Sequence, residues 1–280
     1  MSGSSDVEKK IRVFSDIGDI IDAMKAYAGV AIRKTEGIIL NIREYERNVL
    51  LALAEVISAD TAACFAVPGS AKRLLVCCGS SQGLCGAYNE KMADTVSALV
   101  KGEDSLYVIG RRLRSSLESR RIGHDAFQEF IAGVSGIEGA WRECISRLLD
   151  LYRSGGFYTL TLVFTAVAEK QAGITVENIL PPGICATRDD GKRRPRPLMY
   201  LDPAALFDKL LEEYISISLY RGLVESLRSE NWYRLRSMEG ASENIRRHIT
   251  DLESLRRYLR QEEITGEILE ILGSGGFFTR

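Results

Sequence analysis

The stretch from Ala204 to Leu272 reads AALFDKLLEEYISISLYRGLVESLRSENWYRLRSMEGASENIRRHITDLESLRRYLRQEEITGEILEIL. It contains no proline, and its apolar residues recur at spacings of three and four, which is the pattern of a helix. A helix of this length spans about 100 Å. Because a domain of this size cannot enclose such a length, the sequence predicts that another part of the chain and other subunits cover it.

A second apolar stripe, at the N-terminus, can supply part of that cover. Its members recur with an average step of about 3.5, the period of a coiled coil. It comprises Val7, Ile11, Phe14, Ile17, Ile21, Met24, Ala28, Ile32, Thr35, Ile39, Ile42, Tyr45, Val49, Leu53 and Val56. The matching stripe of the tail comprises Leu206, Leu210, Ile217, Val224, Leu227, Leu235, Met238, Ala241, Ile245, Ile249, Leu252, Leu255 and Leu259. We predict that the two ends of the chain form a long antiparallel coiled coil.

The prolines divide the chain into three parts. All of them fall between positions 68 and 203: Pro68, Pro181, Pro182, Pro195, Pro197 and Pro203. Proline inside a helix costs about 3 kcal/mol, so only the flanks are free to form long helices. The expected domains are an N-terminal shaft helix over 1–67, an α/β foot over 68–203 and a C-terminal shaft helix over 204–280.

The middle part alternates between buried strands and amphipathic helices. We expect strands at Arg73–Cys78, Ser105–Ile109, Phe157–Ala168 and Gly173–Leu180, and helices at about Tyr88–Val100 and Ile137–Tyr152. A basic segment, Arg111 to Arg121, follows the second strand. Such alternation is typical of a largely parallel sheet. The predicted fold class is therefore α/β, with the long coiled coil joined to a small Rossmann-like domain.

The composition is that of a globular protein with balanced charge. Its 280 residues include 37 basic and 38 acidic side chains, for a net charge of −1, and 45% are hydrophobic. This balance, and the lack of an aromatic stacking module, give no reason to expect nucleic acid as a partner. The polar N-terminus is not a signal peptide, and the longest apolar run, Phe157 to Ala168, is too short for a membrane helix. We expect a soluble protein without direct membrane insertion.

The cysteines and histidines do not suggest a metal site. The six cysteines are scattered among apolar neighbours: Cys64, Cys77, Cys78, Cys85, Cys144 and Cys185. No two CxxC elements are present, and His124 and His248 are the only histidines. We interpret the cysteines as free thiols in a reducing compartment, and we expect neither a metal nor another cofactor.

The most enzyme-like element is the turn GSSQGLCG, Gly79 to Gly86, between a strand and a helix. Such turns can hold a phosphate on backbone amides. Its spacing is GxxxGxxG rather than GxGxxG, however, and the Walker A pattern GxxxxGK[ST] is absent from the chain. A catalytic role for the Cys85 thiol lacks a neighbouring base, and Asp189-Asp190 have the composition of an exposed loop. A structural turn or protein-contact loop is the favoured interpretation.

Three groups of basic residues remain. They are Arg111-Arg112 with Arg120-Arg121, the loop Lys192 to Arg196, and the tail arginines Arg228, Arg234, Arg236, Arg246, Arg247, Arg256, Arg257 and Arg260. Such groups are usually solvated faces of helices and loops. For the tail we favour contact with acidic protein loops, because the helix is too long to be buried within its own domain.

Several segments resemble the γ subunit family of F-type rotary ATP synthases. In the tail, Ser229-Glu230, Arg234, Met238 and the run Arg260 to Ile271 are similar to the family's SExxxRMxxM and RQxxITxEIxEI segments. Upstream, the segments LYRGLVES (219–226), QGLCGAYN (82–89) and AMK (23–25) resemble its LYRALLES, DRGLCGGYN and AMK. These matches span nearly the whole chain in the right order.

The resemblance implies a central rotor shaft that carries out no bond chemistry itself. The coiled coil would stand inside a hexamer of alternating alpha and beta subunits, and the foot would rest with the epsilon subunit on the membrane c-ring. It implies that Arg260, Gln261 and Thr265 engage a catch loop of the catalytic subunits. It also implies that Met24, Lys25, Arg234 and the turn Gly83-Leu84-Cys85-Gly86 lie near their acidic lever loop. The implied location is the cytoplasmic face of the cell membrane.

The chain departs from the family at its N-terminus. Where the family usually carries a basic stretch resembling RSVKNTxQITKAMK, this chain has Asp16, Asp19 and Asp22. The residues ahead of GLCG also read Ser-Ser-Gln rather than Ser-Asp-Arg. These changes resemble the divergent branch of alternative synthases called N-ATPases.

Two other functions stay open at this stage. The turn at Gly79 to Gly86 is compatible with an α/β domain that binds a nucleotide or another small molecule and carries helical arms. A paralogous scaffold that has kept the shaft and lost the synthase would show the same helices.

Overall fold

The computed structural model describes residues 2–56, 72–129, 133, 136–154, 157–168, 171–183 and 200–275. Several residues discussed above lie outside these ranges: Cys64, Pro68, Cys185, Asp189, Asp190, and the basic loop 192–196.

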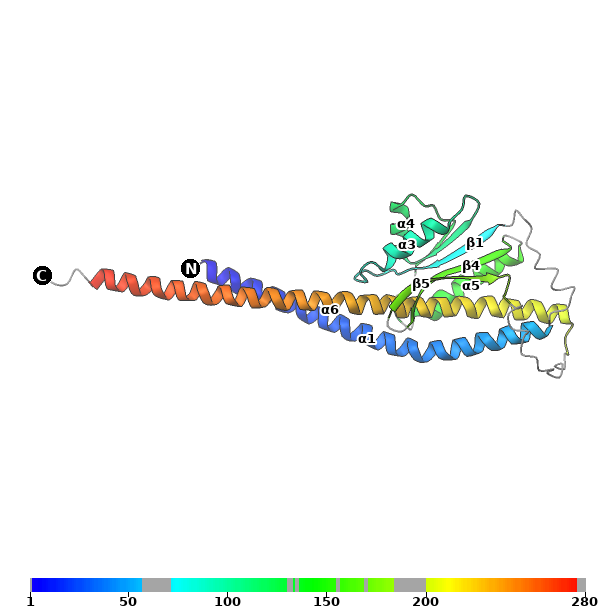
Figure 1. The fold of residues 1–280 in the computed structure, drawn as a ribbon, viewed down its shortest axis with the longest axis horizontal. Coiled ribbons are helices and arrows are strands. Elements are labelled where there is room, and N and C mark those ends of the chain that lie inside the picture. Colours follow the sequence, from blue (N-terminus) through cyan, green and yellow to red (C-terminus); the bar gives the residue numbers. More distant parts are fainter. Residues whose placement is uncertain are drawn as a thin grey trace. The chain divides into compact units, whose positions relative to one another are not determined.

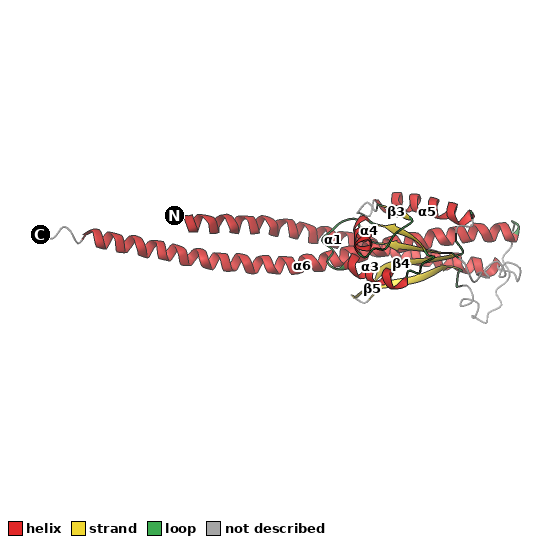
Figure 2. Cartoon of the chain, turned by 90° about the horizontal axis from the view of Figure 1, so that it is seen from above, coloured by secondary structure: helices red, strands yellow, loops and turns green. Residues whose placement is uncertain are grey.

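Within the described ranges, long helices flank a set of alternating strands and helices (Figure 2). The helices are α1 (Ser2–Val56), α3 (Tyr88–Leu99), α4 (Arg111–Ser119), α5 (Ile137–Arg153) and α6 (Pro203–Gly275). The strands are β1 (Arg73–Cys78), β2 (Ser105–Ile109), β3 (Ala126–Gln128), β4 (Thr159–Ala168) and β5 (Gln171–Leu180). The predicted fold class is confirmed, and α6 is a single helix of 73 residues.

The start of α6 is specified by two adjacent residues. The carboxylate of Asp202 accepts hydrogen bonds from the amides of Ala204 and Ala205 at 3.2 and 3.3 Å, which is an N-cap. Pro203 occupies the first helical position, where its missing N–H has no helical partner to lose. The last proline of the sequence therefore begins the helix instead of breaking it.

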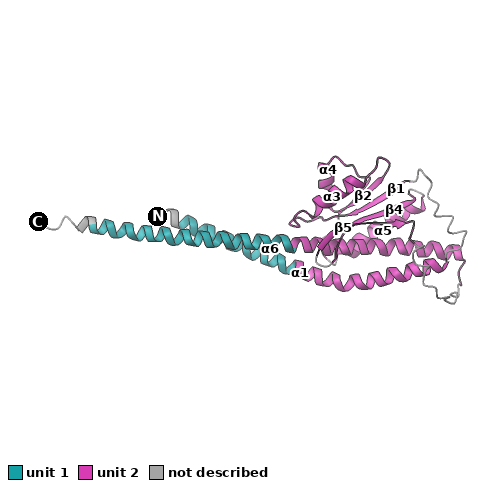
Figure 3. Ribbon diagram, viewed as in Figure 1, with its two compact units in different colours: residues 1–27, 235–280 teal, residues 28–234 magenta. Residues whose placement is uncertain are grey.

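The chain forms two compact units (Figure 3). Unit 1 contains residues 1–27 and 235–280, and unit 2 contains residues 28–234. Both α1 and α6 contribute to each unit.

In unit 2 the strands form one sheet in the order β3-β2-β1-β4-β5. The strands β3, β2, β1 and β4 pair in parallel, with Leu75 of β1 opposite Leu106 of β2 and Thr161 of β4. The edge strand β5 pairs with β4 in the antiparallel direction, so that Val163 lies opposite Val176. The largely parallel sheet predicted from the sequence is confirmed, with one antiparallel edge.

The two faces of this sheet bury different helices (Figure 1). Alternate strand residues such as Val76, Tyr107 and Leu162 pack with side chains of α1, α5 and α6. The other face, which includes Leu75 and Val163, packs against α3 and α4. The sheet is therefore the middle layer of three, and α6 is part of its larger core.

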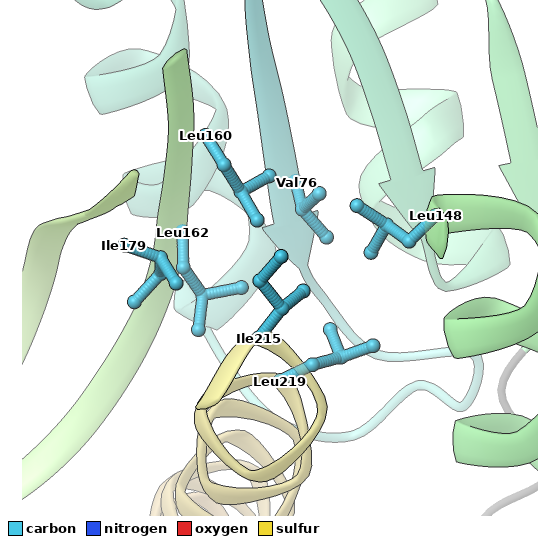
Figure 4. A pocket seen from close by; sticks show the side chains of 7 residues that line it. All are labelled: Val76, Leu148, Leu160, Leu162, Ile179, Ile215 and Leu219. Atoms are coloured by element: carbon cyan, nitrogen blue, oxygen red, sulfur yellow. The ribbon is translucent and has the colours of Figure 1, made fainter. Parts of the chain in front are cut away.

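The larger core contains a small cavity among its described residues. A cavity of about 10 Å³ lies between the sheet, α5 and α6 (Figure 4). Its lining is aliphatic and comprises Val76, Leu148, Leu160, Leu162, Ile179, Ile215 and Leu219. A space of this size without polar groups offers no place for a ligand or a stable water.

In unit 1 the two helices pair in the antiparallel direction. The rings of Phe14 and His248 stack with centroids 5.5 Å apart. A methyl group added at Gly18 would lie 3.8 Å from the Cγ2 atom of Ile245, which shows how close the backbones are there. The same register brings the start of α1 opposite the region of Arg260, and α6 continues beyond it (Figure 1).

Two details of the apolar stripes differ from the prediction. Ile17 and Tyr45, predicted members of the N-terminal stripe, are 39% and 48% exposed, whereas Ala31 and Glu46, which the prediction did not include, are buried. Leu255 of the tail stripe is 45% exposed. A fixed step of about 3.5 therefore follows the seam only approximately, because a straight α-helix has about 3.6 residues per turn and its buried face drifts relative to such a step.

Candidate functional site

The part of α6 in unit 2 lies directly against the sheet. A methyl group added at Gly222 would come within 2.5 Å of the Cδ2 atom of Leu162, so only glycine fits there without rearrangement. The hydroxyls of Ser226 and Ser229 donate hydrogen bonds to the carbonyls of Cys78 and Thr165 at 2.8 and 2.7 Å. The small residues of α6 thus allow direct hydrogen bonds to strand backbones.

Ion pairs connect α1 and α6 within the same unit. Arg228 contacts Glu36 at 2.9 Å, and Arg221 contacts Glu46 at 2.6 Å. The carboxylate of Glu225, which is completely buried, receives a hydrogen bond from Arg43. These contacts fix the position of one helix along the other.

The glycine-rich turn after β1 is held by close packing within the chain. A Cβ atom at Gly79 would lie 2.2 Å from the Cβ atom of Leu113, and one at Gly110 would lie 2.7 Å from the carbonyl carbon of Gly79. Gly110 also has a φ of 105°, which favours glycine. Two of these glycines are therefore explained by contacts between the β1 and β2 ends, without a bound phosphate.

The tip of the turn presents one apolar side chain. Leu84 has a φ of 65° and is 54% exposed, and Gly86 has a φ of 54°. Cys85, between them, is buried, and its Sγ atom lies 3.6 Å from both the Oγ atom of Ser80 and the Nδ2 atom of Asn89. Burial raises the pKa of the Cys85 thiol, although the Ser80 hydroxyl opposes the rise. A raised pKa keeps the thiol protonated and disfavours a nucleophilic role.

Arg234 joins this turn to α6. Its guanidinium is only 3% exposed, and it donates hydrogen bonds to the side chains of Glu230 and Asn231 and, at 3.4 Å, to the carbonyl of Gly83. Burial raises the pKa of Glu230, and the Arg234 charge opposes that rise. The structure therefore brings together two of the predicted site regions, Arg234 and the Gly83–Gly86 turn, through contacts inside the chain.

A polar depression of about 410 Å³ adjoins the turn. Its lining comprises Gly83, Leu84, Cys85, Gly86, Asn89, Glu90, Arg112, Ser115, Ser116 and Ser119. The Glu90 carboxylate is already engaged by Arg120 and Ser116, and these hydrogen bonds lower its pKa. The Arg112 guanidinium lies nearest to the turn, 3.2 Å from the position of a Cβ atom at Gly83.

The other predicted contact residues lie in unit 1. Met24 and Lys25 are partly buried on α1, and the Lys25 ammonium pairs with Asp22 at 3.1 Å. Arg260, Gln261 and Thr265 are exposed on α6. Their spacing, with Ile264 and Ile268, places polar and apolar side chains together on neighbouring faces of the helix. The hydroxyl of Thr265 donates to the carbonyl of Gln261 at 2.8 Å.

Sequence reasoning did not identify one group of residues in unit 2. Arg221 of α6 contacts Glu46 of α1 and Glu177 of β5, so that three elements meet at this group. The residues are far apart in sequence, and each alone resembles an ordinary charged surface residue. The one available signal was that Glu46, a charged residue, lies on the buried side of the N-terminal apolar stripe.

The described residues hold no group of three or more His, Cys, Asp or Glu side chains placed to bind a metal ion. Among the described helices, none is both long and apolar enough to cross a membrane.

Solved structures with the same fold come from mitochondrial ATP synthases. A chain of the Euglena gracilis rotor aligns over 93% of this chain and 98% of its own length, with a TM-score of 0.62 and 14% identity. A chain of the Tetrahymena thermophila central stalk and c-ring structure aligns over 80% of this chain and 99% of its own, with a TM-score of 0.61 and 20% identity. At these identities the likeness establishes the fold alone.

Curated relatives align from end to end. The ATP synthase gamma chain of Heliobacterium modesticaldum is 29% identical over 286 residues, and that of Halothermothrix orenii is 28% identical over 286 residues. Each alignment covers 98% of both chains. The family described as ATP synthase matches residues 4–275. Because that match spans nearly the whole sequence and these relatives are gamma chains, the chain belongs to the ATP synthase family as one of its gamma chains.

Proposed function

We propose that this chain is the central rotor stalk subunit of an ATP synthase, coupling ion flow through a membrane c-ring to ATP synthesis or hydrolysis in an alpha/beta hexamer. It acts as a shaft and carries out no bond chemistry. The observation that carries the proposal is the far part of α6, where every residue from Arg260 to Leu272 is exposed.

This exposure includes large apolar side chains. Ile264, Ile268, Ile271 and Leu272 are 50 to 69% exposed in the isolated chain. A row of such residues on one helix is unfavourable in water and is typical of a surface that a partner covers. The alpha and beta subunits are the proposed cover.

Particular residues are proposed to contact these subunits. Arg260, Gln261 and Thr265 would engage a catch loop of the catalytic subunits, since a guanidinium gives reversible, directional contacts to acceptor groups. Met24 and Lys25 would lie near a lever loop. For the Gly83–Gly86 turn, exposed Leu84 is the proposed contact, and buried Arg234 would act by holding the Gly83 carbonyl.

The sheet of unit 2 is proposed to rest with the epsilon subunit on the c-ring. The assembled chain would lie at the cytoplasmic face of the membrane as a peripheral component. The N-ATPase-like departures at Asp16, Asp19 and Asp22 remain a prediction about its branch.

Reconstitution tests the proposal. The purified chain is mixed with the alpha and beta subunits of the same organism, and the mixture is separated by size. We expect a stable complex whose ATP hydrolysis depends on the presence of this chain. Failure to enter the complex, together with unchanged hydrolysis, would exclude the rotor function.

A double substitution tests the contact residues. Arg260→Ala with Gln261→Ala should weaken assembly or torque transmission and leave the sheet folded, as judged by circular dichroism. Arg33→Ala is the matched control, because this arginine is exposed on α1 in unit 2 and belongs to none of the proposed contact groups. Equal assembly and turnover in both variants would remove Arg260 and Gln261 from the proposed site.

The polar depression beside the turn supports one second candidate, a site for a nucleotide or another small molecule. The observation that supports this candidate is that the Arg112 guanidinium lies beside Gly83 in a depression of about 410 Å³. Saturable nucleotide binding by the isolated chain, lost in Gly83→Leu, is the expected result. Absence of saturable binding in the unaltered chain would reject this candidate.

A further inference from the structure

Three elements of unit 2 meet at the guanidinium of Arg221. Arg221 belongs to α6, its Nε atom lies 2.6 Å from a carboxylate oxygen of Glu46 on α1, and its Nη2 atom donates to Glu177 on β5 at 2.7 Å. The side chains of Arg221 and Glu46 are only 10% and 11% exposed. A single planar group therefore connects the helix pair to the edge strand of the sheet.

The surroundings of Arg221 restrict its orientation. Its guanidinium lies over the ring of Phe164, 5.4 Å from the ring centre. The other carboxylate oxygen of Glu46 accepts a hydrogen bond from the hydroxyl of Ser218 at 2.6 Å. Glu46 is thus held by two groups of α6 one helical turn apart, which fixes both its height and its rotation relative to that helix.

The charges of this group favour the ionised arginine. Burial lowers the pKa of Arg221, but the carboxylates of Glu46 and Glu177 more than offset this effect, so that the pKa is raised. The Nη2 group of Arg221 donates to Glu177, whereas its Nε group has no hydrogen-bond partner, so the close contact with Glu46 is an ion pair. The planar guanidinium spreads its charge between two carboxylates, and a lysine ammonium lacks this planar shape.

The other ion pairs between α1 and α6 each include one half-exposed side chain, although Arg228 also donates to the carbonyl of Val167 on β4 at 3.5 Å. The side chain of Arg43 is 54% exposed, and that of Glu36 is 50% exposed. Exposed pairs contribute little directional constraint because their side chains exchange freely with water. Among the ion pairs described for this unit, the one at Arg221 is buried on both sides and also reaches the sheet.

We propose that Arg221 is a positioning residue for rotary coupling, which holds α1 and α6 at one fixed rotation relative to the sheet so that torque passes between sheet and helices without slip. The inference rests on the proposed rotor function. In this proposal the Arg221, Glu46 and Glu177 group determines how tightly ion transport is coupled to ATP hydrolysis. Assembly of the complex and stability of this chain do not depend on the group.

The test separates coupling from stability in the reconstituted, membrane-bound complex. In Glu46→Leu with Arg221→Met the ion pair is replaced by apolar side chains of similar volume, a change that often leaves stability equal or higher. We expect normal assembly and ATP hydrolysis, with ions transported per ATP hydrolysed lower by at least about twofold. Arg221→Lys should give an intermediate ratio, since lysine keeps the charge and loses the planar shape.

Glu36→Ala is the matched control, because it removes another ion pair between α1 and α6 through a side chain that is half exposed. An unchanged coupling ratio in both the double variant and Arg221→Lys would overturn the proposal. If the double variant does not assemble, the coupling ratio of Arg221→Lys decides alone. Failure of the unaltered chain to enter the complex would instead refute the rotor function, so the two failures are distinguishable.

Discussion

Two stretches of α6 share a helical spacing of apolar residues but have different surroundings. In the stretch that belongs to unit 2, every residue from Arg221 to Leu227 is buried, whereas every residue from Arg260 to Leu272 is exposed. Both stretches carry apolar residues at helical spacing. Helix formation alone is marginal in water, so a stretch without neighbours depends on partners that bind it. The spacing of apolar residues therefore predicts that a stretch is helical, whereas the neighbouring elements determine whether that helix is buried.

The largest difference in lost stability is expected between two ion pairs whose partners are both four residues apart on α6. Glu230 and Arg234 are 2% and 3% exposed, and Glu243 and Arg247 are 57% and 70% exposed. Glu230→Gln leaves a buried charge without its counterion and should lower the free energy of unfolding by about 3–5 kcal/mol. Glu243→Gln should lower it by about 0.5 kcal/mol or less. Urea unfolding of the full chain measures both, and equal losses would contradict the comparison.

A second pair of substitutions compares apolar packing. Leu219 is 3% exposed and lines the 10 Å³ cavity. Leu219→Ala should cost about 2–5 kcal/mol, since it enlarges a cavity that the rigid sheet cannot close. Leu255, at 45% exposure, is the matched control, and Leu255→Ala should change the unfolding free energy by about 0.5 kcal/mol or less. A large loss at Leu255 would show that it is covered in the isolated chain.

A third comparison uses the same change with opposite expected signs. Gly222→Ala places a methyl group against Leu162 and should destabilise the chain by about 1–3 kcal/mol. At Gly240 no atom lies within 4 Å of an added Cβ, so Gly240→Ala should stabilise the helix by about 0.5–1 kcal/mol. Thermal unfolding followed by circular dichroism gives both shifts. Stabilisation by both changes would show that α6 is not tightly seated on the sheet.

The smallest effect on the free energy of unfolding is expected from lowering the pH. Burial of Asp104 opposes its charge, but hydrogen bonds from Arg73 and from the amide of Lys101 outweigh this, so its pKa is lowered. The contribution of Asp104 to stability is therefore present above the unfolded pKa of about 4 and is lost as the pH falls through the folded value. Asp104→Asn should destabilise the chain at neutral pH and not in strong acid.

Asp6→Asn is the control for the acid experiment, because Asp6 and Lys9 are 3.9 Å apart and mostly exposed. It should leave the pH dependence of urea unfolding unchanged. A neutral-pH loss in Asp104→Asn that persists in strong acid would contradict the assigned role of the Arg73 ion pair.

Elements of the fold were predictable where the local pattern of apolar residues in the sequence matches their burial in the structure. The strands at Arg73–Cys78 and Ser105–Ile109 were predicted at their observed bounds, because both are short apolar runs between polar turns. The helical tail, the pairing of the chain ends and the family are also confirmed.

Other elements carry too little local signal. Strand β3 has only three residues, and the predicted basic segment forms α4 because Leu113 and Leu117 are buried one turn apart. Strand β5 begins at Gln171, two residues before the predicted start, and its antiparallel direction follows from the lack of a helix between it and β4.

The site was predicted less completely than the fold. Motifs identified Arg234 and the Gly83–Gly86 turn, but only the structure shows that the arginine is buried and holds the Gly83 carbonyl. Glu46 and Arg221 could not be paired from the sequence, since each resembles a surface charge until α1 and α6 are placed together.

The pairing of the two chain ends also determines the order in which the protein can be completed during synthesis. The core of unit 2 contains Leu53 of α1 and Leu219 of α6. The ribosome synthesises Leu53 early and Leu219 late. At about 5–20 residues per second, roughly 7 to 30 seconds separate the end of α1 from the start of α6. Throughout this interval the apolar stripe of α1 and one face of the sheet lack their partner. A nascent chain arrested before Pro203 is therefore a natural substrate for chaperones.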